Sequence, residues 1–535
     1  MRRTRSRIGG AVTLQLAIWS VLMPVTGLGL PQTNSEVSYV FPDRGGVSYE
    51  TTNAAGTSAA VAYTRISPTG GSSAPPGFGI FGFRNTDGVL VTEASVRAVP
   101  LIRNGRTVAE VAGTTVNTGI AFANPNAVDV RVDFYFSNPS VSPDDFGHGT
   151  LTIGANQQFS GFLSAAPFNL DPGSPGSLTF TADQPIAAVA LTQTINTRGE
   201  SLYSALPVVD LDAPNAVDTA FLPHFATGFE VGGGGRWTTD IILVNPTDEA
   251  IAGTVIFVSS GLLHPTNPLW DTPGVSTPVS VNGSVDQAAH NYAIGPKGVT
   301  ILRTTTGFQF LRTGSVRVVP ATQTEGFLPV TPVVQTSFFN ENASGVVLSQ
   351  AAFPGVQPGW KYRMYVESSG TPGQAGAIQS GFAISQFALN NDGFVRTRLN
   401  LELTDLEGNF VASTTLDIPS SGQRSMFLEN AFEEGVLANF ERGVLRIEDV
   451  TENTSVAITG LRARVNQRGE FLITTTPPVD EDGSSGTGDR FFPHLVDGGG
   501  WSTQAILFSG RTAQSGAGTM QFIGADGQPF DIPLQ

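Results

Sequence analysis

Cysteine is absent from all 535 residues of this chain. Its absence excludes disulfides, cysteine nucleophiles, thiolate metal sites and iron–sulfur clusters, so hydrophobic cores and backbone ladders must supply the stability. Histidine is scarce as well, with five residues in the whole chain. Beyond the N-terminal region no run of 18 apolar residues occurs, which predicts no transmembrane helix there.

Charge is also in short supply, and most of it is negative. Charged residues make up 14% of the chain, against about 25% in an ordinary soluble protein. The 45 acidic and 29 basic side chains give a net charge of −16, which disfavours nucleic acid and anionic membranes as partners. Glycine (62) and proline (35) are abundant, as is typical of short strands joined by tight turns.

The N-terminus has the pattern of a leader sequence. A basic start, "MRRTRSR", is followed by the apolar run "AVTLQLAIWSVLM" and by small residues in "PVTGLG". This pattern predicts a signal peptide over residues 1–29 and a secreted, extracellular or periplasmic bacterial protein. An uncleaved membrane anchor is the alternative, but the apolar run is shorter than the about 20 residues of a membrane span.

Long motifs occur twice in the chain. "NTRGESLYSALPVVD" ends at Asp210 and "NQRGEFLITTTPPVD" ends at Asp480, an offset of 480 − 210 = 270. The same offset separates His224 from His494 (494 − 224 = 270), within "FLPHF" and "FFPHL". Such long internal similarity predicts tandem copies of one architecture.

Within each copy, the segments "TDIILV", "RVDFYF" and "TRLNLELT" alternate apolar and polar residues. A period of two is typical of strands with one buried face. The Asn-Pro pairs at Asn124 and Asn245 initiate turns between such strands, and we therefore expect hairpins at both places. The sequence predicts an all-β protein of tandem Ig-like or jelly-roll-like antiparallel β-sandwiches.

The two ends of the chain each match half of a unit. The last 47 residues (535 − 489 + 1) resemble the first half of the unit that begins near residue 219, and the N-terminal segment resembles its second half. A half sandwich alone would expose an apolar face and unpaired edges, so we expect the halves to complete one composite sandwich. They can meet within one chain, or between chains as a filament. The alternative is that both ends are weakly homologous decorations that pack separately. The predicted segments are the signal peptide 1–29, the N-terminal half-unit 35–87, the sandwiches 88–210, 219–344 and 345–480, and the C-terminal half-unit 489–535.

The repeated motifs contain two histidines, His224 and His494, and two tryptophans, Trp237 and Trp501, each beside a glycine-rich segment. One interpretation is a ligand-binding loop with an aromatic platform, for example for a sugar. The other is that these rings pack at the seam between neighbouring sandwiches. We favour the seam, because the motif directly follows a linker between units.

Both linkers between units are acidic. Calcium bound by their carboxylates would stiffen the joints, whereas a solvated flexible linker is the simpler interpretation. The spacing is not that of an EF-hand. The residues that would bind calcium are Asp210, Asp212, Asp218, Asp480, Asp482 and Asp489. We expect no other cofactor.

Catalytic motifs give little signal. "DGGGWS" has no lysine and no following helix, so it is not a phosphate-binding loop, and no G-x-S-x-G motif occurs. A pair of carboxylates facing one cleft, as in a glycosidase, has no fixed sequence motif, so the sequence leaves this alternative open. We expect a secreted or cell-surface structural or adhesive protein without catalysis. The alternatives are an array of carbohydrate-binding modules and a glycosidase-like enzyme. Expected partners are a further copy of the chain through the terminal half-units, or surface glycans and proteins.

The segments "TDIILVNPTDEAIAGTVIF", "GVLRIEDVTENTSVAITGLRARVNQRGEFLITTTPPVD" and "FPHLVDGGGWST" resemble a group of exported bacterial β-sandwich repeat proteins without an assigned function. The resemblance covers nearly all of the chain after the predicted leader. It implies the architecture and an extracellular location. It implies no catalytic residue.

Overall fold

The computed structural model describes residues 32–52, 58–69, 72–138, 147–173, 175–230, 235–305, 310–322, 324–388, 395–483, 486 and 488–534. The predicted signal peptide, residues 1–29, lies outside the described residues. Within the described ranges, no helix is long and apolar enough to cross a membrane.

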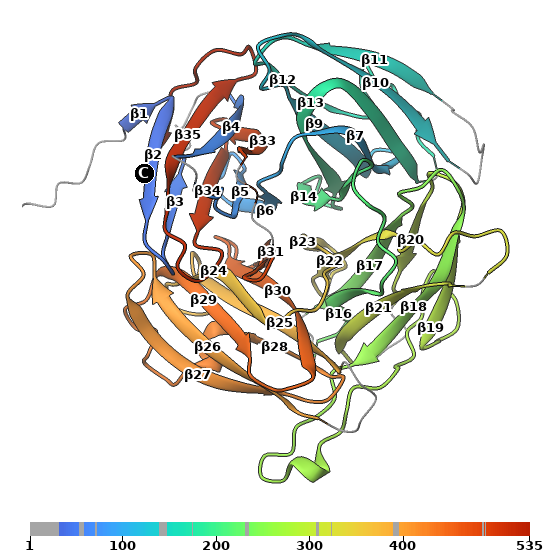
Figure 1. Cartoon of the computed structure of the whole chain (residues 1–535), viewed down its shortest axis with the longest axis vertical. Coiled ribbons are helices and arrows are strands. Elements are labelled where there is room, and N and C mark those ends of the chain that lie inside the picture. Colours follow the sequence, from blue (N-terminus) through green and yellow to red (C-terminus); the bar gives the residue numbers. More distant parts are fainter. Residues whose placement is uncertain are drawn as a thin grey trace, which may run out of the picture.

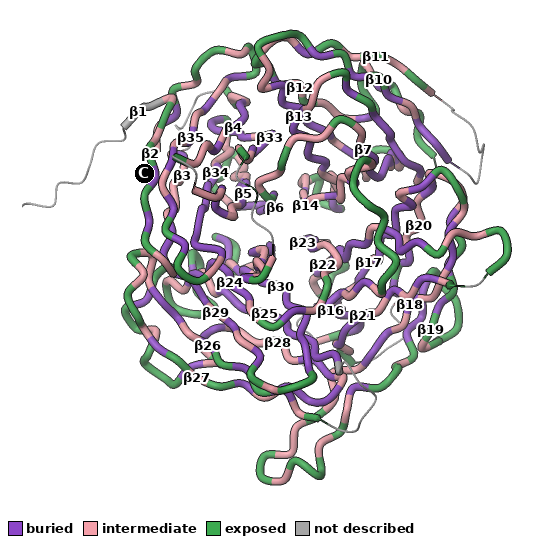
Figure 2. The backbone as a smooth tube through the Cα atoms, viewed as in Figure 1, coloured by how far each residue is buried: buried purple, intermediate pink, exposed green. Residues whose placement is uncertain are grey.

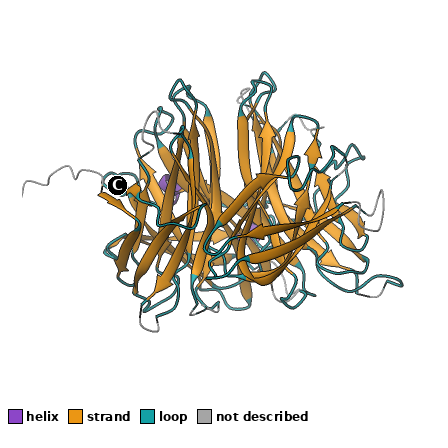
Figure 3. Cartoon of the chain, turned by 90° about the horizontal axis from the view of Figure 1, so that it is seen from above, coloured by secondary structure: helices purple, strands orange, loops and turns teal. Residues whose placement is uncertain are grey.

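The chain is nearly all β, with 60% strand and 2% helix, and its sheets are antiparallel (Figure 3), which confirms the predicted fold class. The helical elements of the described part are one 3-10 turn, η1 (Pro268–Trp270), and one short helix, α1 (Leu428–Ala431). The period-two prediction is confirmed in "TRLNLELT", which lies in β26 (Thr397–Asp405), where buried residues alternate with more exposed ones.

Four β-sandwiches stand side by side in a ring (Figure 1). Each sandwich has two sheets, and the apolar side chains between them form its core. Buried residues therefore follow the interior of each sandwich and the seams, while exposed residues gather along the outer rim (Figure 2). We number the sandwiches in ring order and call the one made from both chain ends the composite sandwich.

The second sandwich follows the composite in the chain. Its long strand β13 (Gly176–Ile195) belongs to both sheets, with a change of register between Thr181 and Ile186. One sheet has the order β11-β10-β13-β7-β15, and in the other β12, β9, β13 and β14 pair in turn. The remaining strands are β7 (Ile102–Ala109), β8 (Val111–Ala112), β9 (Val116–Ala123), β10 (Val130–Ser137), β11 (His148–Ile153), β12 (Gln158–Phe162), β14 (Ser201–Leu206) and β15 (Val208–Asp210).

The third sandwich pairs the sheet β19-β18-β21-β16 with a sheet in which β20, β17, β22 and β23 are neighbours. Phe225 and Phe257 meet edge to face in its core, with ring centroids 5.2 Å apart. Its strands are β16 (Ala220–Phe229), β17 (Arg236–Val244), β18 (Ile251–Ser259), β19 (Ala289–Ile294), β20 (Val299–Arg303), β21 (Arg312–Pro320), β22 (Val333–Glu341) and β23 (Val347–Pro354).

The fourth sandwich has the same arrangement. One sheet runs β27-β26-β29-β24, with β32 also on β24, and the other contains β28, β25, β30 and β31. Helix α1 follows β28 and buries Leu428 in the core. The further strands are β24 (Lys361–Ser369), β25 (Ile378–Ala388), β27 (Phe410–Ile418), β28 (Gln423–Phe427), β29 (Arg442–Asp449), β30 (Thr454–Val465), β31 (Phe471–Thr476) and β32 (Val479–Asp480).

The composite sandwich joins the two ends of the chain. Its sheets have the orders β2-β35-β4-β33 and β3-β34-β5-β6. In the first sheet, strands of the two chain ends alternate, and in the second, β34 of the C-terminal segment lies between β3 and β5 of the N-terminal one. In a further pair, β1 with β36, Gln32 lies opposite Leu534. The strands are β1 (Gln32–Asn34), β2 (Glu36–Phe41), β3 (Gly46–Glu50), β4 (Ala60–Pro68), β5 (Gly77–Arg84), β6 (Leu90–Arg97), β33 (Arg490–Asp497), β34 (Trp501–Phe508), β35 (Gly516–Gly524) and β36 (Ile532–Leu534).

The composite core is shared between the two chain ends. Phe41 and Ile66 come from the N-terminal segment, and Leu507 and Met520 come from the C-terminal segment. Strand for strand, the two sheets have the order of the third sandwich, with the chain ends in place of the connection between β18 and β19. The C-terminal strands β34 and β35, which would accept strands from another chain in a filament, pair instead with β3 and β2 of the same chain.

Two predicted boundaries fall inside a sheet. β6 follows the boundary expected at residue 88, yet it pairs with β5 in the composite sandwich. β23 follows the boundary expected at residue 345, yet it pairs with β22 in the third sandwich. In both places a tight turn, pinned by the Asn85 or Asn342 side chain, folds the strand back onto its predecessor.

The predicted Asn-Pro hairpins are wrong. β9 and β10 lie on either side of Asn124, but they do not pair with each other and belong to different sheets, as do β17 and β18 around Asn245. Both asparagines are fully buried, and each amide donates to a carbonyl just after the second strand that follows it. Asn124 reaches the Gly154 carbonyl at 2.8 Å, and Asn245 reaches the Gly295 carbonyl at 2.8 Å. The motif thus turns the chain from one sheet to the other across the core.

The innermost strands β6, β14, β23 and β31 surround the ring axis (Figure 1). Here the two "RGE" motifs face each other, because Arg198 pairs with Glu470 at 2.6 Å and Arg468 pairs with Glu200 at 2.6 Å. The repeated motif therefore closes the centre of the ring through two reciprocal ion pairs.

Candidate functional site

His224 lies at the seam between the third and fourth sandwiches. β16 carries it into a buried position, where its Nδ1 is 3.0 Å from Gln423 Nε2 of β28 and its ring packs on Phe338. Burial lowers the pKa of His224 to about 4. The imidazole is therefore neutral at physiological pH and ties two sandwiches together.

His494 makes the same kind of contact at the opposite seam, between the composite and second sandwiches. Gln158 Nε2 lies 3.1 Å from His494 Nδ1 and 3.2 Å from the Pro493 carbonyl oxygen. A carbonyl only accepts, so the amide nitrogen faces both groups and donates to Nδ1. Burial lowers the pKa of His494 to about 4, and the proton of the neutral ring sits on Nε2.

Trp237 is enclosed. It is 9% exposed, its indole N–H donates to Glu230 Oε1 at 2.5 Å, and its ring faces Phe471 with centroids 6.3 Å apart. Phe471 in turn lies against Phe427, with centroids 6.5 Å apart. The space beside Trp237 is thus filled by side chains of the fourth sandwich.

Trp501 is half-buried and open on one side. It packs on Phe83 and Tyr203, with ring centroids 4.9 Å and 5.4 Å away. Its indole N–H makes no hydrogen bond within the part of the chain that the structure describes. Beside it lies a pocket of about 320 Å³ between the composite and second sandwiches, a volume at the lower end of small-molecule sites.

The two seams differ at one position of the repeated motif. Ser201 holds the position in "NTRGES" that Phe471 holds in "NQRGEF" (471 − 201 = 270). Phe471 fills the space between Trp237 and Phe427, whereas the pocket beside Trp501 is lined by Phe162 and Tyr203 and has no ring from position 201.

The pocket is apolar with a few hydrogen-bonding groups. Phe81, Phe162, Val189 and Leu191 form walls, and the polar groups come from Trp501, Tyr203, His494 and Ser160. The Tyr203 hydroxyl accepts a hydrogen bond from Gln193 Nε2 at 3.0 Å, which leaves its own proton free to donate. Among the described lining residues, no side chain is charged, because His494 is neutral.

The predicted calcium ligands are not brought together. Within the described ranges, no group of three or more His, Asp or Glu side chains is arranged to hold a metal ion. Asp210 and Asp480 each accept a hydrogen bond from the backbone two residues on, of Asp212 and Asp482. Asp489 instead pairs with Arg65 at 2.5 Å, and Asp218 offers its carbonyl oxygen to the Thr331 hydroxyl.

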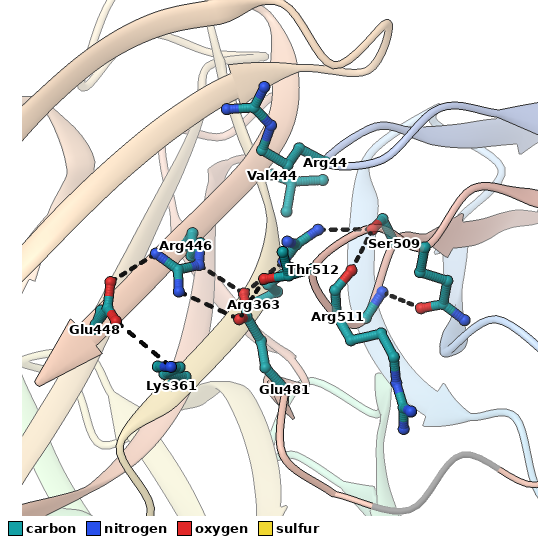
Figure 4. A network of polar contacts seen from close by, with 12 residues as sticks. Arg44, Lys361, Arg363, Val444, Arg446, Glu448, Glu481, Ser509, Arg511 and Thr512 are labelled. Atoms are coloured by element: carbon teal, nitrogen blue, oxygen red, sulfur yellow. Dashed lines mark hydrogen bonds and ion pairs between the residues drawn. The ribbon is translucent and has the colours of Figure 1, made fainter.

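A buried ionic network that we did not predict joins the fourth sandwich to the composite one (Figure 4). Arg363 is 1% exposed and donates to Glu481 at 2.6 Å, to Asp43 at 2.9 Å and to the Ser509 hydroxyl at 2.6 Å. Burial alone would raise the pKa of Glu481, but hydrogen bonds from Arg446 and Arg363 hold it below its usual value. Buried ion pairs and hydrogen bonds therefore hold the fourth sandwich against the composite one.

No protein-family model matches the chain, and no curated protein matches it. The resemblance to exported β-sandwich repeat proteins therefore stays a prediction. The pocket residues Tyr203, Phe81 and Phe162 escaped the sequence analysis because they come from three distant strands. The contrast between Ser201 and Phe471 was visible in the aligned motifs, but its meaning needs the neighbouring sandwich.

Proposed function

We propose that this protein is an exported, non-catalytic adhesive protein that holds a surface glycan in the pocket beside Trp501. The observation that carries the proposal is the open indole of Trp501, whose N–H has no partner in the described structure while the N–H of Trp237 is satisfied by Glu230. An aromatic face with an unused donor, set in a pre-formed pocket, is what a ligand site requires.

The pocket chemistry favours a neutral sugar. A pyranose ring offers an apolar C–H face and hydroxyl oxygens at its rim. The face fits against the Trp501 ring, and the oxygens can accept from the Trp501 indole, the His494 Nε2–H and the Tyr203 hydroxyl. Since no described lining side chain is charged, an ionic ligand would lose its hydration without a partner.

The ring supports binding because it holds the pocket walls rigid. Trp501 and His494 come from β34 and β33, Phe162 comes from β12, and Tyr203 comes from β14. The bond between Gln158 and His494 fixes the distance between the two sandwiches. A pre-formed site spends little binding free energy on ordering side chains. The exported location rests on the predicted leader and on the resemblance.

Binding of the purified protein to an array of neutral and acidic glycans tests the proposal. Wild type is compared with W501A, with S201F, which imitates the closed seam, and with W270A as a control, since Trp270 is 68% exposed on η1 away from the pocket. We expect W501A and S201F to weaken binding about 30-fold or more, because a buried Trp contact is worth about 2 kcal/mol or more. W270A should bind like wild type.

Equal thermal midpoints would show that the variants are folded. Binding that survives both W501A and S201F would remove the pocket from the proposal. Release of new reducing ends from a bound glycan would overturn the non-catalytic part and support the glycosidase alternative.

A further inference from the structure

Three arginines without a carboxylate partner among the described residues line a recess between the composite and fourth sandwiches. The recess has a volume of about 330 Å³ and is walled by prolines, among them Pro76 and Pro477. Arg97 lies at the end of β6, Arg490 at the start of β33, and Arg511 in the turn after β34. All three come from the composite sandwich.

None of the three has a carboxylate partner within the described part of the chain. Arg511 donates to the Gly483 carbonyl at 2.6 Å, and its guanidinium points away from Glu481 and Arg363 (Figure 4). Arg97 and Arg490 make no hydrogen bond or ion pair through their side chains with the residues that the structure describes. The arginines of the adjacent network, Arg363 and Arg446, pair with Glu481, whereas the three arginines of the recess have no such carboxylate.

Arg97 carries its charge in a confined place. Solvent reaches its side chain, but the surrounding protein still lowers the pKa of Arg97 to about 10 by desolvation. The guanidinium therefore stays protonated at neutral pH. Asp480 is the one acidic side chain among the described residues of the lining, and its Oδ1 is engaged by the Asp482 backbone N–H. The lining thus carries a net charge of +2 (three arginines, one aspartate).

We infer that this recess binds an oxyanion, the carboxylate or phosphate group of a small organic ligand. Guanidinium groups bind such groups through two parallel N–H donors, and three guanidinium groups without a carboxylate partner provide more donors than one oxyanion needs. The inference rests on different residues from the glycan pocket and does not depend on it.

The test measures binding of sodium phosphate and sodium glucuronate by calorimetry at constant ionic strength, because salt screens surface charge. R97Q/R490Q is compared with R131Q/R398Q, which removes two arginines whose side chains are 62% and 61% exposed elsewhere. We expect saturable binding in wild type and in the control, weakened tenfold or more in R97Q/R490Q.

Both arginine pairs can be replaced without emptying a core, so a folding defect would not explain the loss. Tighter binding of phosphate would assign a tetrahedral oxyanion, and tighter binding of glucuronate would assign a carboxylate. The inference fails if neither anion binds saturably at millimolar concentration. It also fails if the two double variants lose affinity equally, since the attraction would then be diffuse.

Discussion

The shared core of the composite sandwich makes a strong prediction about Phe41. This side chain is 1% exposed, stacks on Tyr39 and lies opposite Gly516, across the pairing of β2 with β35. Replacing it by alanine removes a buried ring from a core that both chain ends build. Such a change costs about 3–5 kcal/mol. At tenfold for every 1.4 kcal/mol, opening of the composite sandwich becomes about two to four orders of magnitude more frequent.

Hydrogen exchange read by mass spectrometry is the assay, because it reports opening segment by segment. In F41A we expect faster exchange in residues 36–66 and, together with them, in residues 490–524. The matched control is F134A, since Phe134 lies opposite Gly149 in the second sandwich and is 3% exposed. F134A should speed exchange in residues 102–210.

The reasoning would be refuted by F41A leaving residues 490–524 as protected as in wild type. The N-terminal strands would then fold without the C-terminal ones. Equal acceleration in all four sandwiches would instead show that the ring opens as one unit.

Three further predictions concern buried charge, each read from urea unfolding. R363M leaves Glu481 buried with fewer partners and should lower the unfolding free energy by about 3–5 kcal/mol; an unchanged midpoint would deny the network its role. His224 and His494 have folded pKa values near 4, below the about 6.5 of an unfolded histidine, so they add stability above pH 6.5 that is lost as the pH falls toward 4. H224N/H494N should flatten that slope, and an unaltered slope would contradict the burial argument. Burial raises the pKa of Asp240 to about 7, above the about 3.9 of an unfolded aspartate, so its contribution to stability is present below pH 4 and is lost as the pH rises to 7. D240N should therefore gain stability relative to wild type between pH 4 and pH 7.

Much of the fold follows from local pattern. Alternation in "TRLNLELT" predicts a strand with one buried face, and β26 has it. The same alternation could not tell a hairpin from a turn between sheets, because both place the apolar face on one core. The buried amide of Asn245 donates to the Gly295 carbonyl and so stabilises the turn between the two sheets.

The candidate site was predicted in part. The motif pointed to four residues, and the structure places His494 and Trp501 in one pocket while His224 and Trp237 lie in a filled seam. The filling depends on Phe471, which a different sandwich contributes. No local pattern in the sequence around Trp237 reports the size of a side chain that arrives from a distant strand.

The sequence by itself determined that this protein is built of strands and that it has no cysteine chemistry, and it predicted that the two chain ends complete one sandwich. Alternation, composition and half-units are properties of neighbouring residues and of apolar faces. Only the tertiary structure decided which seam is open, which arginines lack a partner and which charges are buried. Those properties depend on side chains hundreds of residues apart, such as Arg363 and Asp43 at 2.9 Å, and packing alone brings them together.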